Sequence, residues 1–422
     1  MGDVVTNPID WPSLRRVKPD PSAPTTPSQP FRSLYGAVAT AGTIAALPPV
    51  VVLTMIKHKI YGPPTGARGW MPMRAEVFMR VVQLVLCRFV WAMPGVDRKE
   101  WDLHAIPDGV ECKQVTIQPA RAPRTGFAVC DAVEGVARPG FILSPKDAEA
   151  KGWDKALPGE KAILYFVGGG YAFGHPLERP FAGRMAKKFG VRVLAVNYRK
   201  VLNSSQAFPA PLLDALAGWE YLTNNLGFEA SNITISGESA GGNLSLLLTR
   251  YLADLDTPLP GALALSSPWC DMGPDSHKRN SMTANYFSDY LPWFGAKAAR
   301  SAARHYAHEA RRTAYFAPVH ATKEEWAHLK DVNVYVQAGS GEILVDEIRI
   351  TVKNMRSAGV EVAYVEEPGG VHIAPSFVLS GSEAWHQWRD DVGPLVKGTT
   401  AEVKGWPVVR PSWAEANEGL LQ

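Results

Sequence analysis

Cysteine is scarce in this chain of 422 residues, which contains four: Cys87, Cys112, Cys130 and Cys270. None of them forms a CxxC pair or a Cys/His spacing suited to a metal ion, and the ten histidines form no HExxH motif. A disulfide framework and a zinc hydrolase are therefore not expected. We predict buried free thiols, no metal and no cofactor.

An excess of charge of one sign is also missing, because 44 basic residues face 41 acidic ones. The net charge of +3 argues against a nucleic-acid binder. Hydrophobic residues make up 46% of the chain and charged residues 20%, which is an ordinary globular composition and not that of a disordered chain. The partner we expect is a small molecule, and the oligomeric state, a homodimer included, stays open.

The first hundred residues differ from the rest of the chain. Residues 1–31 are polar and rich in proline, and we expect this arm to lack fixed structure. The 23 residues from Leu34 to Ile56 contain no charged side chain, and about 20 apolar residues suffice to span a bilayer as a helix. Pro48 and Pro49 are expected to kink or break that helix.

Two interpretations of this apolar segment stay open. In the first, it associates the protein with a membrane, for which the endoplasmic reticulum is the candidate compartment. In the second, the protein is cytoplasmic, and the segment folds into a buried helix followed by a strand-like run, Val50–Met55, in a cap.

A second helix is predicted from about Met73 to Met93. Arg80 and Gln83 are expected to lie off its apolar face. This helix would pack in the cap, lie at a membrane interface or line a substrate entrance. Its apolar face is formed by Val77, Phe78, Val81, Val82, Val85 and Phe89.

From about Val110 onward, short apolar runs alternate with helical segments, which predicts an α/β fold with a mostly parallel sheet covered on both faces. Between about 273 and 329 the rhythm breaks, and we expect an inserted helical lid. The expected strands are Cys112–Gln118, Ala162–Val167, Val191–Tyr198, Asn232–Ser236, Ala262–Ser266, Asn333–Gln337 and Glu361–Val365. The expected helices are Phe181–Phe189, Pro211–Asn225, Gly242–Asp254, Asp346–Ala358 and Glu383–Val396.

The strongest local motif is GESAGG at residues 237–242, which matches G-x-S-x-G. It follows a predicted strand and opens a predicted helix, which is the context of a nucleophilic serine on a sharp, strained turn. The flanking glycines are expected because side chains there would collide with the neighbouring strand and helix. Ser239 is therefore the candidate nucleophile.

A glycine-rich loop, Gly168–Tyr171, follows the Ala162–Val167 strand. Free backbone N–H groups in such a loop can bind the negative oxygen of a tetrahedral intermediate. A dinucleotide-binding loop is the competing interpretation, but G-x-G-x-x-G with a following ribose-binding acid is absent.

Together these motifs resemble the hormone-sensitive-lipase-like branch of the α/β-hydrolases, which includes arylacetamide deacetylases and fungal steryl acetyl hydrolases. The resemblance covers residues 105–397 and implies an α/β-hydrolase fold with a helical lid. It rests on VGGG at 167–170, YR at 198–199, GESAGG at 237–242, FPA at 208–210 before Asp214, and SPW at 267–269.

The chain departs from the family pattern at two places. Val167 replaces a histidine that is expected to brace the glycine loop, and Lys200 begins an altered turn after Arg199. The resemblance nevertheless implies that the N–H groups of Gly169 and Gly170, with that of Ala240, form the oxyanion hole.

The resemblance also implies a base and an acid later in the chain, in the order serine, acid, histidine. His372, in a glycine-rich loop after the Glu361–Val365 strand, is the expected base. The acid is either Glu342 or Asp346, and alignment with the family motif favours Glu342. Asp346 would instead cap the helix that follows.

The function implied is a serine carboxylic-ester hydrolase that forms an acyl-serine on a lipophilic, short-acyl ester, such as an acetyl ester of a sterol or secondary metabolite. An acyltransferase or cyclase with the same site stays open, because sequence does not show water access under the lid. A non-catalytic binding protein is disfavoured by the presence of His372. The expected organisation is an arm with the two apolar helices at 1–104, a catalytic domain at 105–397 and a tail at 398–422.

Overall fold

The computed structural model of the protein describes residues 9–16, 18–23, 31–64, 71–89, 106–149, 153–291, 295–376 and 381–398. All but the first residue of the tail predicted at 398–422 lies outside these residues, as do parts of the predicted arm.

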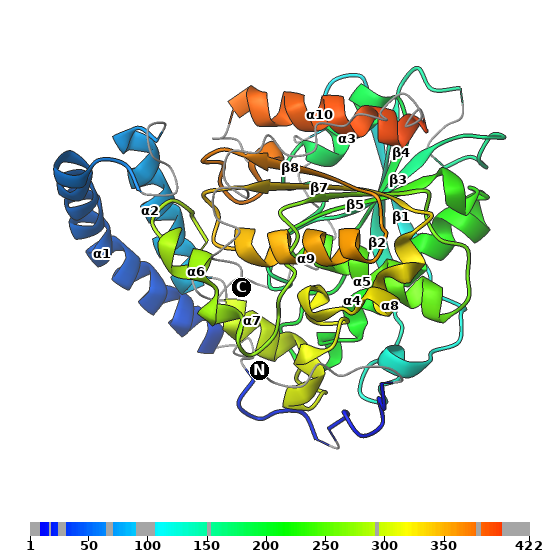
Figure 1. Ribbon diagram of the computed structural model, residues 1–422, viewed down its shortest axis with the longest axis horizontal. Helices are drawn as coiled ribbons and strands as arrows, with labels where there is room; N and C mark the ends of the chain where they lie inside the picture. The colour runs from blue at the N-terminus through cyan, green and yellow to red at the C-terminus, as the bar shows by residue number, and fades with distance from the viewer. Residues whose placement is uncertain are drawn as a thin grey trace.

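Within the described residues, eight strands form one sheet in the order β1-β2-β4-β3-β5-β6-β7-β8 (Figure 1). The pairs β1–β2 and β2–β4 are antiparallel, and the remaining neighbours are parallel. The strands are β1 Val110–Ile117, β2 Arg138–Pro145, β3 Ala162–Phe166, β4 Arg192–Val196, β5 Ile233–Glu238, β6 Ala262–Ser266, β7 Asn333–Gly339 and β8 Val362–Glu367.

Helices cover both faces of this sheet. In Figure 1, α3 and α10 lie above it, and α4, α5 and α9 lie below. Every residue of β3, β4, β5 and β6 is buried, as expected for parallel strands that are covered on both faces. The helices of these layers are α3 Phe181–Phe189, α4 Ala210–Glu220, α5 Ala240–Asp254, α9 Val345–Ser357 and α10 Gly381–Lys397.

The predicted α/β class and mostly parallel sheet are confirmed, and all seven expected strands are present, β6 with the expected ends and the other six with shifted ends. The strand β2 is not foreseen, because Pro139 and Gly140 near its start are residues typical of turns. Close packing favours glycine at position 140, since a Cβ there would lie 2.5 Å from Cδ1 of Ile117.

The connection between β6 and β7 contains the whole segment predicted as a lid, and its described residues form short helices. They are α6 Asn280–Ala284, α7 Gly295–Ala302 and α8 Lys323–Trp326, with 3₁₀ turns between them. This connection is called the insertion below.

The arm expected to lack fixed structure is ordered over its described residues, 9–16 and 18–23, so that prediction is wrong there. Trp11 is 7% exposed, and its ring packs edge-on against Phe127 at 5.1 Å and Tyr315 at 5.0 Å between centroids. The Arg15 guanidinium donates to the carbonyls of Gly126 and Phe127 at 2.7 and 2.6 Å. Burial of the Trp11 ring and the hydrogen bonds of Arg15 oppose the entropy cost of ordering this segment.

The apolar segment is a single helix, α1 Phe31–Tyr61, which continues through Pro48 and Pro49. The predicted break is wrong, because the fixed φ of proline is itself a helical value. Pro48 and Pro49 have no backbone N–H, so the helix loses hydrogen bonds at these positions but does not end there. The strand-like run expected at Val50–Met55 is helical as well.

The helix α1 is not buried in a cap, which corrects the second interpretation of this segment. Only 11% of its most apolar stretch is buried, and the helix is long and apolar enough to cross a membrane by length and composition alone. It stands at the side of the molecule and packs beside α2 Met73–Phe89 (Figure 1). Its exposed large apolar residues include Leu34, Val38, Ile44, Val52, Leu53, Ile56 and Ile60.

The helix α2 binds the insertion through residues that were expected to lie off its packed face. Arg80 and Gln83 are both 6% exposed, whereas Phe78 is 40% exposed. Arg80 donates to the carbonyl of Tyr286 at 3.0 Å, and Gln83 donates to that of Leu291 at 2.9 Å. The prediction that α2 packs through its apolar face alone is therefore wrong in part. Backbone carbonyls of the insertion need hydrogen-bond donors, and polar side chains of α2 supply them at these buried positions.

One buried carboxylate joins the two N-terminal helices. Glu76 of α2 is 0% exposed and accepts from Lys57 Nζ at 2.5 Å and contacts His58 Nδ1 at 2.7 Å, both of α1. The pair of helices is thus tied together by charge as well as by apolar contact.

Candidate active site

Ser239 lies at the sharp turn between β5 and α5, where its backbone has φ 54° and ψ −121°. This left-handed conformation is strained for a residue other than glycine. Close packing explains the glycines of the motif, because a Cβ on Gly237 would lie 2.2 Å from the Gly241 carbonyl oxygen. A Cβ on Gly241 would lie 2.0 Å from the carbonyl oxygen of Phe166. The predicted strand-turn-helix is therefore present.

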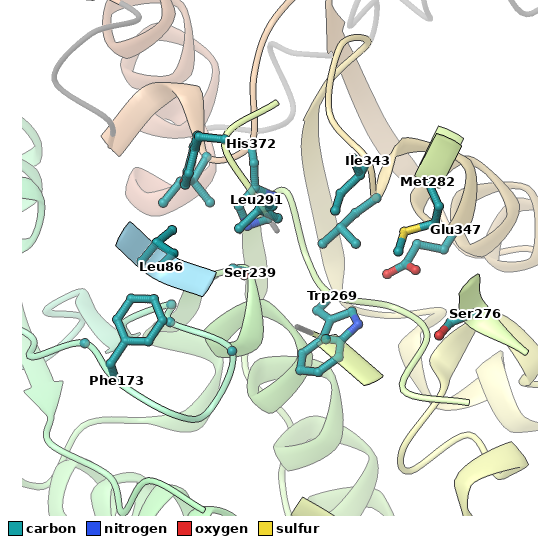
Figure 2. Close-up of a pocket in the computed structure, with 18 of the residues that line it drawn as sticks. Leu86, Phe173, Ser239, Trp269, Ser276, Met282, Leu291, Ile343, Glu347 and His372 are labelled. Atoms are coloured by element: carbon teal, nitrogen blue, oxygen red, sulfur yellow. The ribbon is translucent and has the colours of Figure 1, made fainter. Parts of the chain in front are cut away.

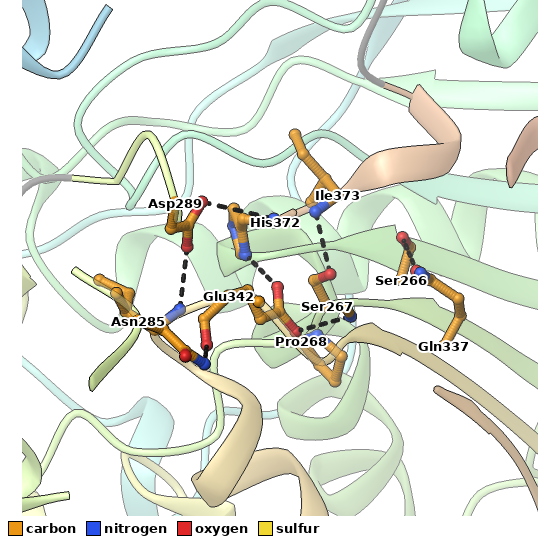
Figure 3. A network of polar contacts seen from close by, with 12 residues as sticks. Ser266, Ser267, Pro268, Asn285, Asp289, Gln337, Glu342, His372 and Ile373 are labelled. Atoms are coloured by element: carbon orange, nitrogen blue, oxygen red, sulfur yellow. Dashed lines mark hydrogen bonds and ion pairs between the residues drawn. The ribbon is translucent and has the colours of Figure 1, made fainter. Parts of the chain in front are cut away.

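His372 and Glu342 are in contact. Nδ1 of His372 lies 2.8 Å from Oε2 of Glu342, and the two side chains are 1% and 0% exposed (Figure 3). Glu342 follows β7 and His372 follows β8, so neighbouring parallel strands bring the two loops together. We assign the shared proton to Nδ1, because an ionised carboxylate can only accept.

Ser239 and His372 both line one cavity (Figure 2). Nε2 of His372 is buried and has no hydrogen-bond partner among the described residues. Burial lowers the pKa of His372 from 6.5 to about 4, while Asp289 and Glu238 oppose this shift. The ring is therefore neutral near pH 7, with Nε2 able to accept a proton.

Hydrogen-bond donors surround the carboxylate of Glu342. Burial raises the pKa of this carboxyl from 4.5 to about 8, although hydrogen bonds from the Ser267 hydroxyl and the Gly339 N–H oppose the shift. The Nδ1–H of His372 is a third donor to the carboxylate, and we assign the ionised form because all three neighbours can donate.

Asp346, the other candidate acid, lies elsewhere. Its Oδ2 accepts from the Ser281 N–H at 2.8 Å, and its Oδ1 pairs with Arg349 at 3.2 Å. Of the two carboxylates, Glu342 is the one that contacts His372.

The glycine loop runs beside the serine. A Cβ on Gly168 would lie 3.1 Å from Cβ of Ser239. Gly169 and Gly170 have φ values of 117° and 58°, and their N–H groups meet no protein acceptor within the described residues. Ala240 is the first residue of α5, where an N–H has no partner within the helix. The loop geometry thus leaves amides available next to Ser239.

Other groups hold the glycine loop at Val167. The hydroxyl of Tyr198 donates to the Val167 carbonyl at 2.6 Å, and the Gly168 N–H donates to Oε1 of Glu238 at 3.4 Å. Glu238 is 0% exposed and forms an ion pair with Arg179, which lines the cavity. This ion pair is not foreseen from the sequence, although Glu238 stands inside the serine motif.

A second residue that sequence reasoning misses is Asp289 of the insertion. It is 0% exposed and accepts from the backbone N–H groups of His372 at 3.4 Å and Ile343 at 2.9 Å (Figure 3). No local motif marks it, because its partners follow β7 and β8.

The cavity has a volume of about 480 Å³ and a mostly apolar lining (Figure 2). Leu86 of α2 and Phe173 lie on one side of Ser239, and Met282 and Glu347 lie on the other. Within the described residues, no group of histidine, cysteine or acidic side chains is placed to hold a metal ion. The arrangement suits acid–base chemistry on an apolar substrate.

Comparison with known proteins agrees with this geometry. Residues 163–376, just over half of the chain, match the model of a family described as alpha/beta hydrolase fold. An acetyl-hydrolase of Streptomyces hygroscopicus is 29% identical over 236 residues, which are 56% of this chain and 75% of that protein. An ethyl acetate hydrolase of Pseudomonas putida is 38% identical over 104 residues, only 24% of this chain and 32% of that protein.

Among solved structures, an esterase from the bacterial hormone-sensitive lipase family superposes with a TM-score of 0.55 at 21% identity. The superposition covers 83% of this chain and 97% of that one, and it supports the fold. The chain therefore belongs to the α/β-hydrolase family and is a carboxylesterase- or lipase-like hydrolase.

Proposed function

We propose that the protein cleaves a lipophilic carboxylic ester with a short acyl group through an acyl-serine formed on Ser239. The observation that carries this proposal is the buried His372–Glu342 contact, which leaves Nε2 of the ring without a partner in the cavity that contains Ser239. A serine hydroxyl is a weak nucleophile until such a base takes its proton.

In the proposed mechanism, Oγ of Ser239 attacks the ester carbonyl carbon while Nε2 of His372 takes the hydroxyl proton. The N–H groups of Gly169, Gly170 and Ala240 stabilise the negative oxygen of the tetrahedral intermediate. His372 then protonates the leaving alcohol as the C–O bond breaks. Water attacks the acyl-serine with His372 again as base, which releases the acid and restores Ser239.

The substrate class is supported by the cavity and by the relatives. A volume of about 480 Å³ with apolar walls suits a compact lipophilic molecule. Two relatives are named for acetyl esters, which favours a short acyl group. We therefore propose a short-acyl, preferably acetyl, ester of a sterol or secondary metabolite.

Replacing the nucleophile tests the proposal. Ser239→Ala is expected to lower kcat for p-nitrophenyl acetate by roughly 10⁴-fold or more, because no other hydroxyl takes its place. Ser357→Ala, at an exposed position in α9, is the control and should keep full activity. Activity retained by Ser239→Ala in a folded protein would refute the assignment.

The choice of acid is tested by a pair of isosteric variants. Glu342→Gln should lower kcat by about 10³- to 10⁴-fold, because an amide no longer stabilises the imidazolium. Asp346→Asn changes a carboxylate that contacts Ser281 and Arg349, and we expect it to cost at most about tenfold in kcat. The opposite ranking would show that Asp346 is the acid.

The pH dependence follows from the buried base. The neutral ring is the reactive form and burial lowers its pKa, so kcat/KM should stay constant as pH falls through 6.5 and decline only at lower pH. Hydrolysis of a neutral ester would be measured from about pH 3 to pH 8, with circular dichroism at each pH to detect unfolding. A decline centred near 6.5 in folded protein would contradict the buried, neutral state of His372.

We further propose that α1 holds the protein on a membrane through its exposed apolar residues. Val52, Leu53 and Ile56 are 53%, 65% and 48% exposed. In detergent-free fractionation, the full chain should sediment with membranes, and the V52D/L53D/I56D variant should move to the soluble fraction, because charged groups are costly in hydrocarbon.

The matched control places the same three charges on the catalytic body. Val129, Val136 and Leu157 are 45%, 38% and 38% exposed, and the V129D/V136D/L157D variant should still sediment with membranes. A wild-type chain found wholly in the soluble fraction would remove the anchor.

A further inference from the structure

One short segment of the insertion, Ser281–Asp289, forms hydrogen bonds with the backbone of the loop that carries Glu342. The side-chain amide of Asn285 donates to the carbonyls of Ser340 and Glu342, both at 2.9 Å. The Ser288 hydroxyl donates to the carbonyl of Gly341 at 2.7 Å. Three successive carbonyls of the acid loop are therefore satisfied by one element that lies more than 50 residues away in sequence.

The same segment also binds the following residues of the loop. The Ser281 hydroxyl donates to the carbonyl of Ile343 at 2.7 Å, and Asp289 Oδ2 accepts from the N–H of Ile343 at 2.9 Å. These groups are buried, so each bond that is lost leaves an unpaired polar group without water to replace its partner.

Asp289 extends these contacts to the histidine loop. Its Oδ1 accepts from the N–H of His372 at 3.4 Å and from its neighbour Tyr290 at 2.8 Å. One carboxylate thus touches the backbone of the base and of the residue after the acid (Figure 3). An asparagine could not replace it, because its NH₂ group would face a backbone N–H whichever way the amide were turned.

The segment also meets the space that substrate would occupy. Met282, Tyr290 and Leu291, within or next to it, line the cavity. The ring of Tyr290 lies 6.1 Å from that of His372, measured between centroids. A ligand in the cavity therefore contacts the same short stretch of chain that holds the two catalytic loops.

We propose that Ser281–Asp289 is a clamp that positions the Glu342 and His372 loops, with Asp289 as its positioning residue. The insertion then does more than cover the cavity, because His372 keeps its catalytic position only while the clamp is hydrogen-bonded to the two loops. A lipophilic substrate packed against Met282 and Tyr290 would stabilise the clamp in this hydrogen-bonded position. This inference rests on the proposed roles of Ser239, His372 and Glu342.

The test compares variants in the full-length protein. Asp289→Asn should lower kcat for p-nitrophenyl acetate on the order of 10- to 100-fold, because small displacements of catalytic groups are costly, with KM changed by less than about threefold. Ser288→Ala, a milder change, should lower kcat by several-fold. Asp275→Asn makes the same substitution at an exposed ion pair of the insertion and should leave kcat unchanged.

A double-variant measurement separates positioning from general destabilisation. If Asp289 acts through the Glu342–His372 pair, the D289N/E342Q double variant should have the kcat of Glu342→Gln alone. Losses that multiply in the double variant, or a kcat for Asp289→Asn equal to that of Asp275→Asn, would overturn the clamp. If Asp289→Asn does not fold, the same comparison of kcat values is made with Ser288→Ala and its double variant with Glu342→Gln.

Ser239→Ala keeps this test distinct from the proposed function. If Ser239→Ala retains activity, the proposed site is wrong and the clamp falls with it. If Ser239→Ala is inactive while Asp289→Asn and Ser288→Ala behave like Asp275→Asn, the site stands and the clamp is wrong.

Discussion

The geometry of the site depends on one buried contact, the 2.8 Å pairing of His372 Nδ1 with Glu342 Oε2. A carboxylate removed from water is stable only when donors replace its hydration. Here the Ser267 hydroxyl and the Gly339 N–H join the imidazole in that role. Because the pair is buried away from water, the charge of the Glu342 carboxylate acts on the His372 ring with little screening. The contact at Nδ1 also orients the ring so that Nε2 faces the cavity.

Other groups hold the glycine loop at the position where this chain departs from the family pattern. Without a histidine at Val167, the glycine loop is held by the Tyr198 hydroxyl and by Glu238, which is neutralised by Arg179. A buried ion pair contributes little net stability, but removing either member would leave an uncompensated charge. We infer that this pair keeps the glycine loop close to Ser239, where its N–H groups can meet a developing negative charge.

The sequence predicts the parts of this site that depend on local pattern. The Ser239 turn needs glycines on both sides within five residues, and the order of serine, acid and histidine follows the order of the strands. The residues it misses act over long separations: Asp289 meets His372 across 83 positions, and Glu238 meets Arg179 across 59. The arm is misjudged for the same reason, because the pocket that receives Trp11 is built from Phe127 and Tyr315. Polar composition describes a segment in isolation and not the surface that it meets.

We infer that the buried His372–Glu342 pair makes Ser239 a nucleophile, and covalent labelling of the serine tests this. The full-length protein would be treated with a fluorophosphonate, and the modified peptide would be identified by mass spectrometry. We expect one adduct, on Ser239, that forms rapidly in the wild type and at least about a hundredfold more slowly in His372→Ala. Labelling at another residue, or an equal rate at Ser239 in both proteins, would contradict it.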